Sequence, residues 1–186
     1  MNQASAIRAR RIEALLERAD SRWSAERQPL IRDYLTHYYA AVATPDLHDR
    51  DLPNLYGAAL SHWSLGEQRR RGQNRLKVYN PDPEQNGWES THTVIQLVAD
   101  DRPFLVDSLS MALNEQGLMI HLIVHPVLEV VRSGEGAATH VSEDPNGDGH
   151  AEAWIHIEVD RQSEDGRLRD IECAIRAALA DVEAAT

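Results

Sequence analysis

The first 72 residues carry the hydrophobic spacing of α-helices. Apolar side chains recur every three or four positions in three stretches, with polar side chains between them. Ser24 is suited to cap the second stretch, and Pro53 suits the first turn of the third, which runs to about Arg71. Residues 1–72 are therefore predicted to form an N-terminal helical segment. The periodic apolar residues are Ile7, Ile12, Leu15, Leu16 and Ala19, then Leu30, Ile31, Tyr34, Leu35 and Tyr38, then Leu55, Ala59, Leu60 and Trp63.

The pattern changes after Gly72, a residue typical of a helix end. Short apolar runs rich in β-branched residues indicate strands, and two stretches with helical spacing lie between them. The predicted elements are strands in "RLKVYNP" and "HTVIQLVA", a helix over 101–116, a strand over 118–131, a loop over 133–150, a strand over 151–159 and a helix over 167–182.

The order of these elements from Thr93 onward is strand, helix, strand, strand, helix. It matches most of a β-α-β-β-α-β ferredoxin-like unit. We therefore predict an α+β fold whose second domain, residues 73–186, is ferredoxin-like and lacks its final strand. An uncovered sheet edge invites association, so we expect that the chain is a fragment of a longer one, or that a partner or the strand at Leu76–Tyr79 fills the gap.

The strand predicted over 118–131 is apolar on both faces. Leu118, Ile120, Leu122, Val124, Leu128 and Val130 alternate with Met119, His121, Ile123, His125, Val127 and Val131. A sheet with one wet face would not need both sets. We expect the C-terminal helices to cover one face and the N-terminal helices or a second subunit to cover the other. Pro126 cannot donate to a strand ladder and is expected at a bulge or an unpaired edge.

Charge and composition exclude several classes of protein. The net charge is +4 over residues 1–80 and -15 over 81–186, which argues against nucleic-acid binding by the second half. No apolar run is long enough for a membrane span, the N-terminus lacks a secretory signal, and Cys173 is the one cysteine. These features favour a cytoplasmic protein. The "RRR" at 69–71 is interpreted as a solvated helix end.

Two stretches offer metal ligands, and neither is predicted to bind a metal. His121, His125 and Glu129 share one side of a strand, but residues four apart are separated by about 13 Å, too far for one ion. His121 opposite His156 is the more feasible pair, although structural histidines are favoured. "DPNGDG" at 144–149 resembles the start of a calcium loop, but Ile155 stands where a bidentate Glu is needed, so an exposed turn is predicted.

No motif for catalysis or for a nucleotide cofactor is found. Neither GxGxxG nor GxxxxGK[ST] occurs, and no nucleophile turn is recognisable. Cys173 lies near the apolar stripe of the last helix and is expected to be a buried or half-buried, inert thiol. The chain is therefore predicted to be non-catalytic and to hold no cofactor.

The loop that begins at Asp100 is the strongest candidate for ligand binding. Asp101 is suited to cap a helix with Pro103 in its first turn. The amide groups of that turn can receive a carboxylate, and Asp100 can receive an ammonium group. Together they suit a zwitterionic amino acid. The alternative is that Asp101 is only a cap and Asp100 is solvated.

At this loop the sequence resembles a known family. "DDRPFLVDSLSMALNEQGLMIHLIVHPVLEV", with "YLTHYYAAVATPDL" and "DLPNLYGAALSHWSLGEQRRRGQNRLKVYNP" upstream, resembles the N-terminal ACT-type segment of the large bacterial NAD-specific glutamate dehydrogenases. The resemblance covers about residues 30–182. It implies a long enzyme subunit that oxidises L-glutamate to 2-oxoglutarate and ammonium with NAD, and it places the catalytic domain far downstream of this segment.

The resemblance also implies a role for the loop. ACT domains pair side by side and often bind amino acids at the first strand–helix loop. Carried over, the ligand positions are Asp100, Asp101, Arg102, Pro103 and the start of the helix. Such domains commonly have Gly where this chain has Phe104, whose ring is expected to fill the pocket and so to favour assembly over amino-acid binding.

Three hypotheses follow for the chain. The main one is a regulatory or oligomerisation segment of an NAD-dependent glutamate dehydrogenase, with a homo-oligomer and an amino-acid effector as expected partners. The second is a free-standing ACT-like amino-acid-binding or adaptor domain. The third is a metal or calcium module based on His121, His156 or the "DPNGDG" turn.

Overall fold

The computed structural model describes residues 3–144, 147–164 and 166–186. The N-terminal region is helical, as predicted, but its helices differ in three details. Ser24 does not cap the second helix, which begins at Gln28 after Arg27 and has no side-chain cap. The stretch expected to be a loop before Pro53 contains a short helix, and the third long helix ends at Gly66 rather than Arg71. The four helices are α1 (Gln3–Arg22), α2 (Gln28–Tyr38), α3 (Thr44–His48) and α4 (Leu52–Gly66).

The remaining residues form one antiparallel sheet and three helices. The strand order is β1-β2-β6-β4-β5, and β3 also pairs with β6. The strands are β1 (Arg75–Tyr79), β2 (Thr93–Asp100), β3 (Ile120–Val124), β4 (Val127–Arg132), β5 (Ala138–Ser142) and β6 (His150–Val159), and the helices are α5 (Pro83–Asn86), α6 (Leu105–Glu115) and α7 (Arg167–Ala185). The mixed helix and antiparallel sheet confirm the predicted α+β class.

The single strand predicted over 118–131 is wrong. It is two strands, β3 and β4, and Pro126 lies between them. Pro126 was expected at a bulge or an unpaired edge of one strand, but the strand breaks there, because proline has no amide hydrogen for a ladder. A register shift between Ile120 and Leu122 also moves Ile120 to the opposite face from Leu122. A β-bulge has this effect because its extra residue shifts the alternation of side chains between the two faces.

The predicted loop over 133–150 contains β5, which pairs with β4. Only Val141 of β5 is buried. Its other positions are exposed or half-buried, so the segment carries little hydrophobic signal. The loop predicted after β1 likewise contains the single turn α5, which Asp82 caps by accepting from the amides of Glu84 and Gln85.

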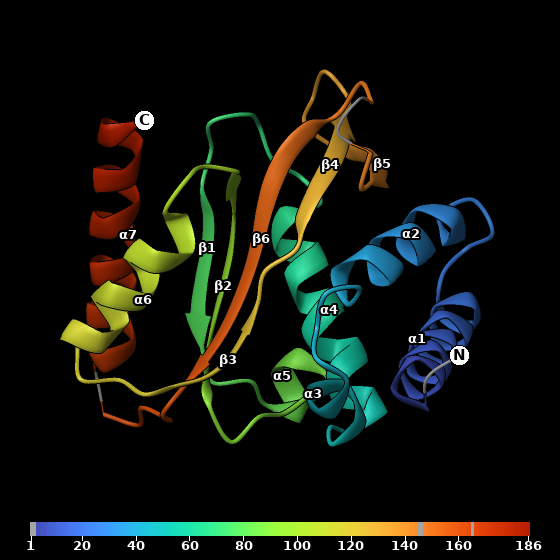
Figure 1. The fold of residues 1–186 in the computed structure, drawn as a ribbon, viewed down its shortest axis with the longest axis horizontal. Coiled ribbons are helices and arrows are strands. Elements are labelled where there is room, and N and C mark those ends of the chain that lie inside the picture. Colours follow the sequence, from blue (N-terminus) through green and yellow to red (C-terminus); the bar gives the residue numbers. More distant parts are fainter. Residues whose placement is uncertain (1–2, 145–146, 165) are drawn as a thin grey trace.

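Helices cover both faces of the sheet (Figure 1). On one face α6 and α7 pack on apolar side chains of β2 and β6, including Ile95, Leu97, Ile155 and Ile157. On the other face the N-terminal helices pack on Val98, Val124, Leu128, Val130, Val141 and Trp154. Of the two coverings expected for this second face, the structure has the N-terminal helices.

The sheet edge beside β2 is occupied by β1, which pairs with it in antiparallel register from Arg75↔Val98 to Tyr79↔Val94. This is the second of the two ways in which we expected the edge to be filled. Among the described residues, no helix has the length and apolar character needed to cross a membrane.

Candidate functional site

The structure changes the expected beginning of the helix after Asp101. Helix α6 begins at Leu105, and the residue before it is Phe104, with φ of 64° and no side-chain cap. The prediction that Asp101 caps this helix with Pro103 in its first turn is therefore wrong. Residues 103 and 104 form a turn outside the helix, so the carboxylate of Asp101 is too far back in the chain to reach its first amides.

Each of the five residues at 100–104 has a different environment. The carboxylate of Asp100 pairs with Arg69 and accepts from the amide of Gly72 at 3.1 Å, so it is not simply solvated. Asp101 is exposed, and its amide donates to Ala151. Arg102 donates to Thr186 Oγ1 at 2.6 Å. Pro103 is exposed in the turn.

Phe104 does not fill a pocket, contrary to expectation. Its side chain is 74% exposed. Its backbone lies in the left-handed region that glycine adopts freely and that costs an L-residue about 1 kcal/mol or more. A bulky residue in this conformation with its ring in solvent is not placed there by core packing.

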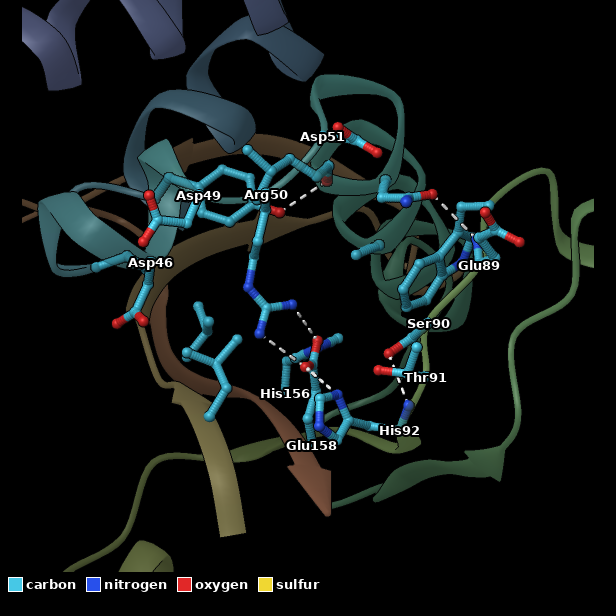
Figure 2. A pocket seen from close by; sticks show the side chains of 18 of the residues that line it. Asp46, Asp49, Arg50, Asp51, Glu89, Ser90, Thr91, His92, His156 and Glu158 are labelled. Carbon is cyan, nitrogen blue, oxygen red and sulfur yellow. Dashed lines mark hydrogen bonds and ion pairs between the residues drawn. The ribbon is translucent and has the colours of Figure 1, made fainter. Parts of the chain in front are cut away.

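A pocket lies at the other end of the sheet, between the N-terminal helices and β6 (Figure 2). Its volume is about 580 Å³. The floor is formed by strand residues, including His156 and Glu158, which lie on the same face of β6 as Trp154 because strand side chains alternate. The wall opposite comes from α3, α4 and the segment between them, which carries Arg50.

An ion pair spans the inner part of this pocket. Arg50 Nη1 donates to Glu158 Oε1 at 2.7 Å and Nη2 donates to Oε2 at 2.8 Å. Glu158 is 1% exposed. His156 Nε2 lies 3.2 Å from Oε1, and His92 Nδ1 lies 3.3 Å from Oε2. Burial raises the pKa of Glu158, but hydrogen bonds from His156 and Arg50 outweigh it and hold the pKa at about 2.

A chain of buried polar groups continues from this ion pair into the core. His156 Nδ1 lies 3.2 Å from Gln96, whose amide donates to Ala58 O at 2.9 Å. Nearby, His62 Nε2 lies 3.0 Å from Leu97 O and its Nδ1 lies 2.8 Å from the hydroxyl of Tyr38. Since a carbonyl only accepts, Nε2 donates and Nδ1 accepts from Tyr38. Burial, with His156 nearby, lowers the pKa of His62 to about 3.

The pocket is amphipathic and its mouth is acidic. Asp46, Asp49, Asp51 and Glu89 surround the opening, as Figure 2 shows. Tyr38, Tyr39 and Trp88 line it with aromatic surface. Such a cavity, which combines apolar surface with converging polar and charged groups, is suited in shape to hold a small polar molecule. The arrangement suits binding rather than covalent chemistry, because no serine or cysteine side chain among the described lining residues hydrogen-bonds a side-chain base.

The candidate metal ligands are not brought together. His121 hydrogen-bonds Asp160 at 2.7 Å and stacks near His92, whereas His156 is buried beside Glu158. In the described part of the chain no group of three or more His, Cys, Asp or Glu side chains is placed to hold a metal ion. Residues 145 and 146 of the "DPNGDG" turn lie outside the described residues. Cys173 is exposed, so the expectation of a buried or half-buried thiol is wrong.

Sequence reasoning missed Arg50 and Glu158. The signal for Glu158 was present in "AEAWIHIEV", where it shares a face with Trp154. A carboxylate on a face that helices cover needs a cationic partner, which makes an arginine in the helical segment the natural candidate. No pattern in the sequence shows which arginine this is.

Comparison with known proteins identifies the family. The model of the family described as "Glutamate dehydrogenase, ACT1 domain" matches residues 34–175. The chain is 38% identical to the NAD-specific glutamate dehydrogenase of Halomonas elongata over 94% of this chain and 11% of that protein. It is 37% identical to the enzyme of the same name from Pseudomonas aeruginosa over 83% of this chain and 10% of that protein.

A more distant relative has the same name. The NAD-specific glutamate dehydrogenase of Mycobacterium tuberculosis is 29% identical over 70% of this chain and 8% of that protein. The chain thus spans about a tenth of the length of the curated relatives it matches. On the family match over residues 34–175 and the two relatives above 35% identity, this chain belongs to the glutamate dehydrogenase ACT1 domain family.

Proposed function

We propose that this chain is a non-catalytic N-terminal regulatory and oligomerisation segment of an NAD-dependent glutamate dehydrogenase. The whole enzyme would oxidise L-glutamate to 2-oxoglutarate and ammonium with NAD, in the cytoplasm. The observation that carries the proposal is a match over most of this chain to about a tenth of each relative. A segment that is so small a share of an NAD-specific enzyme leaves ample chain for the catalytic and NAD-binding parts.

The gene and one activity assay test this assignment. The reading frame is expected to continue past the Thr186 codon into a long sequence with an NAD-binding motif. The purified 186-residue chain is expected to show no NAD reduction with L-glutamate, while the whole polypeptide shows it. A frame that stops shortly after Thr186 would instead favour a free-standing ACT-like adaptor.

The finer fold assignment supports the regulatory role. We propose that β2, α6, the β3–β4 pair, β6 and α7 form a ferredoxin-like unit in which β1 takes the place of the closing strand. The antiparallel pairing of β1 with β2 supports this reading. In this arrangement β1 occupies the position beside β2 that the closing strand has in a ferredoxin-like unit.

The oligomerisation part of the proposal rests on the surface beside α6. Phe104, Met111, Met119, Ile123 and Val127 are exposed large apolar side chains. They come from α6, the turns that flank it, β3 and the first residue of β4. Strand β3 pairs with β6, and no second strand of the described residues pairs with it. An open edge bordered by apolar side chains suits pairing with a second copy.

The molecular mass of the chain in solution tests whether this surface mediates dimerisation. Sedimentation of the chain is expected to give a dimer that Ile123→Lys weakens at least tenfold, because a charge on an edge strand opposes pairing. Ala9→Lys, at an exposed site on α1, is the matched control and leaves the dimer unchanged. A strictly monomeric chain at high concentration contradicts the role of this surface.

Amino-acid binding at residues 100–104 stays a prediction, and the geometry changes its details. Since Asp100 is held by Arg69, we propose Asp101 as the partner of a ligand ammonium group. The first amides of α6 have no side-chain cap and can accept the ligand carboxylate. Calorimetric titration with the L-amino acids is the test: heat that Asp101→Asn abolishes supports it, and no heat with any of them rejects it.

A further inference from the structure

The three arginines at 69–71 are not the end of a helix. Helix α4 stops at Gly66, and Gln68 then forms a β-bridge with Ala137. The amide of Arg69 donates to Gly136 O at 3.0 Å, and the amide of Ala138 donates to Glu67 O at 2.9 Å. Gln68 and Arg69 therefore lie against the turn between β4 and β5, and residues 70–73 form the turn that follows, in which the amide of Gln73 donates to Arg70 O at 3.0 Å.

Arg69 points inward and belongs to a buried charge network. It is 2% exposed, and its guanidinium donates to Glu152 Oε1 at 2.8 Å and to Asp100. Arg132 donates to the same Glu152 at 2.7 and 2.9 Å, as a two-pronged pair. Two arginines and two carboxylates thus neutralise one another beneath the surface.

Arg70 and Arg71 remain as unbalanced cations above this network. Both are exposed, and neither side chain hydrogen-bonds or pairs with any residue that the structure describes. With Arg69 and Arg132 they line a pocket of about 280 Å³. Of the charged groups that line it, Asp148 is the one acid outside the buried network. The pocket is therefore locally basic in a chain whose net charge is -11.

Close backbone packing and hydrogen bonds from Arg132 hold the β4–β5 turn against the arginine run at the wall of this pocket. Gly136 has φ of 96°, and a Cβ there would lie 2.6 Å from Arg69 O. Arg132 also donates to the carbonyls of Gly66 and Gly136, each at 2.8 Å. The turn and the arginine run are thus fixed to each other before any ligand arrives. A preformed site loses less freedom on binding than a flexible one.

We propose that this basic pocket binds a small polyanion that carries phosphate or carboxylate groups. Guanidinium groups offer paired N–H donors whose spacing matches the oxygens of both. The volume suits a compact ligand rather than a dinucleotide. Because Arg69 also holds Asp100, the ligand would lie next to the residue that leads into the 100–104 loop. The site does not depend on the dehydrogenase assignment.

Calorimetry at constant ionic strength tests the proposal with two probes. Inorganic pyrophosphate represents phosphate ligands and succinate represents carboxylate ligands. At least one is expected to bind the 186-residue chain, and the double variant Arg70→Ala/Arg71→Ala weakens that binding at least tenfold. Both side chains are exposed, so the variant is expected to keep the circular dichroism spectrum of the parent chain.

A second double variant separates a site from a general charge effect. Arg10→Ala/Arg169→Ala removes the same charge from exposed positions on α1 and α7. It is expected to bind within twofold of the parent. Equal weakening in both double variants would mean diffuse electrostatic attraction only. No heat with either probe, or heat that survives the Arg70/Arg71 variant, overturns the proposal.

Discussion

Arg50 and Glu158 are 108 positions apart in the sequence, yet the guanidinium of Arg50 donates a hydrogen bond to each carboxylate oxygen of Glu158. The pair joins the helical segment to the central strand β6. Glu158 is almost fully buried, whereas Arg50 reaches it from the pocket side. The pair therefore fixes the position of the α3–α4 connection over the sheet.

Loss of Arg50 is expected to destabilise the chain. Arg50→Ala leaves a buried carboxylate with only its two histidine contacts, which costs on the order of 3 kcal/mol. Urea denaturation measures this as a lower midpoint. Arg32→Ala is the matched control, because the ion pair of Arg32 with Asp20 is exposed and contributes less than about 1 kcal/mol. Equal effects of the two substitutions would show that the buried pair has no special role.

Acid is expected to lower the free energy of unfolding over two overlapping pH ranges. The folded pKa of His62 is lowered to about 3 from an ordinary value of 6.5, so its contribution to stability is complete above pH 6.5 and is lost toward pH 3. The folded pKa of Glu158 is lowered to about 2 from 4.5, so its contribution is lost between those values. Each group gives a slope of at most about 1.4 kcal/mol per pH unit.

Substitutions of His62 and Glu158 distinguish the two pH ranges. Urea midpoints measured from pH 8 to pH 2 give the profile. Between pH 6.5 and 4.5, His62→Gln is expected to flatten it, while Glu158→Gln leaves that part unchanged. The steeper fall below pH 4.5 is expected to disappear in Glu158→Gln. If His62→Gln keeps the full slope above pH 4.5, another group is responsible.

Substitution of Phe104 is expected to be neutral or stabilising. Phe104→Gly relieves the left-handed backbone, a gain of about 1 kcal/mol that the extra freedom of glycine in the unfolded chain partly offsets. The lost ring is mostly in solvent. By contrast, Leu109→Ala removes a fully buried side chain from the helix that follows and costs about 3 kcal/mol. A large loss in Phe104→Gly would mean that the ring packs against the chain.

Gly66→Ala is expected to destabilise the chain although alanine is the better helix former. A Cβ at Gly66 would lie 2.4 Å from Trp154 and 2.8 Å from Val98. The clash costs about 1 to 3 kcal/mol, more than the propensity gain of about 1 kcal/mol. Gly134→Ala is the control, since a Cβ there meets no atom within 4 Å. Thermal melting of both variants checks the difference.

Local pattern was enough to predict the types of the longer elements and the two-sided burial of the sheet, but not the short elements α3, α5 and β5. The alternation in β6 placed Ile155 and Ile157 on one face and Trp154 and His156 on the other, and both cores agree. Periodicity reports burial, and burial here is nearly complete on both faces. The split of the 118–131 strand was not predicted, because Pro126 indicated a bulge or edge without showing that pairing resumes on a second strand.

Contacts between distant residues could not be predicted in the same way. The Asp101 cap failed because a helix start depends on the φ of one residue, Phe104, and phenylalanine rarely adopts a positive value. Arg69 and Arg50 were two of many arginines in the N-terminal half. Their partners Glu152 and Glu158 lie on β6, and only the folded topology brings them together.

The position of β6 at the centre of the sheet also sets the order of events during synthesis. The helices α1–α4 leave the ribosome first, but Trp154, against which Tyr34 and Trp63 stack, comes much later. Their apolar stripes therefore have no complete partner until translation has passed Val159. For this chain the N-terminal half cannot mature ahead of the rest, and the nascent helices depend on protection from aggregation in the interval.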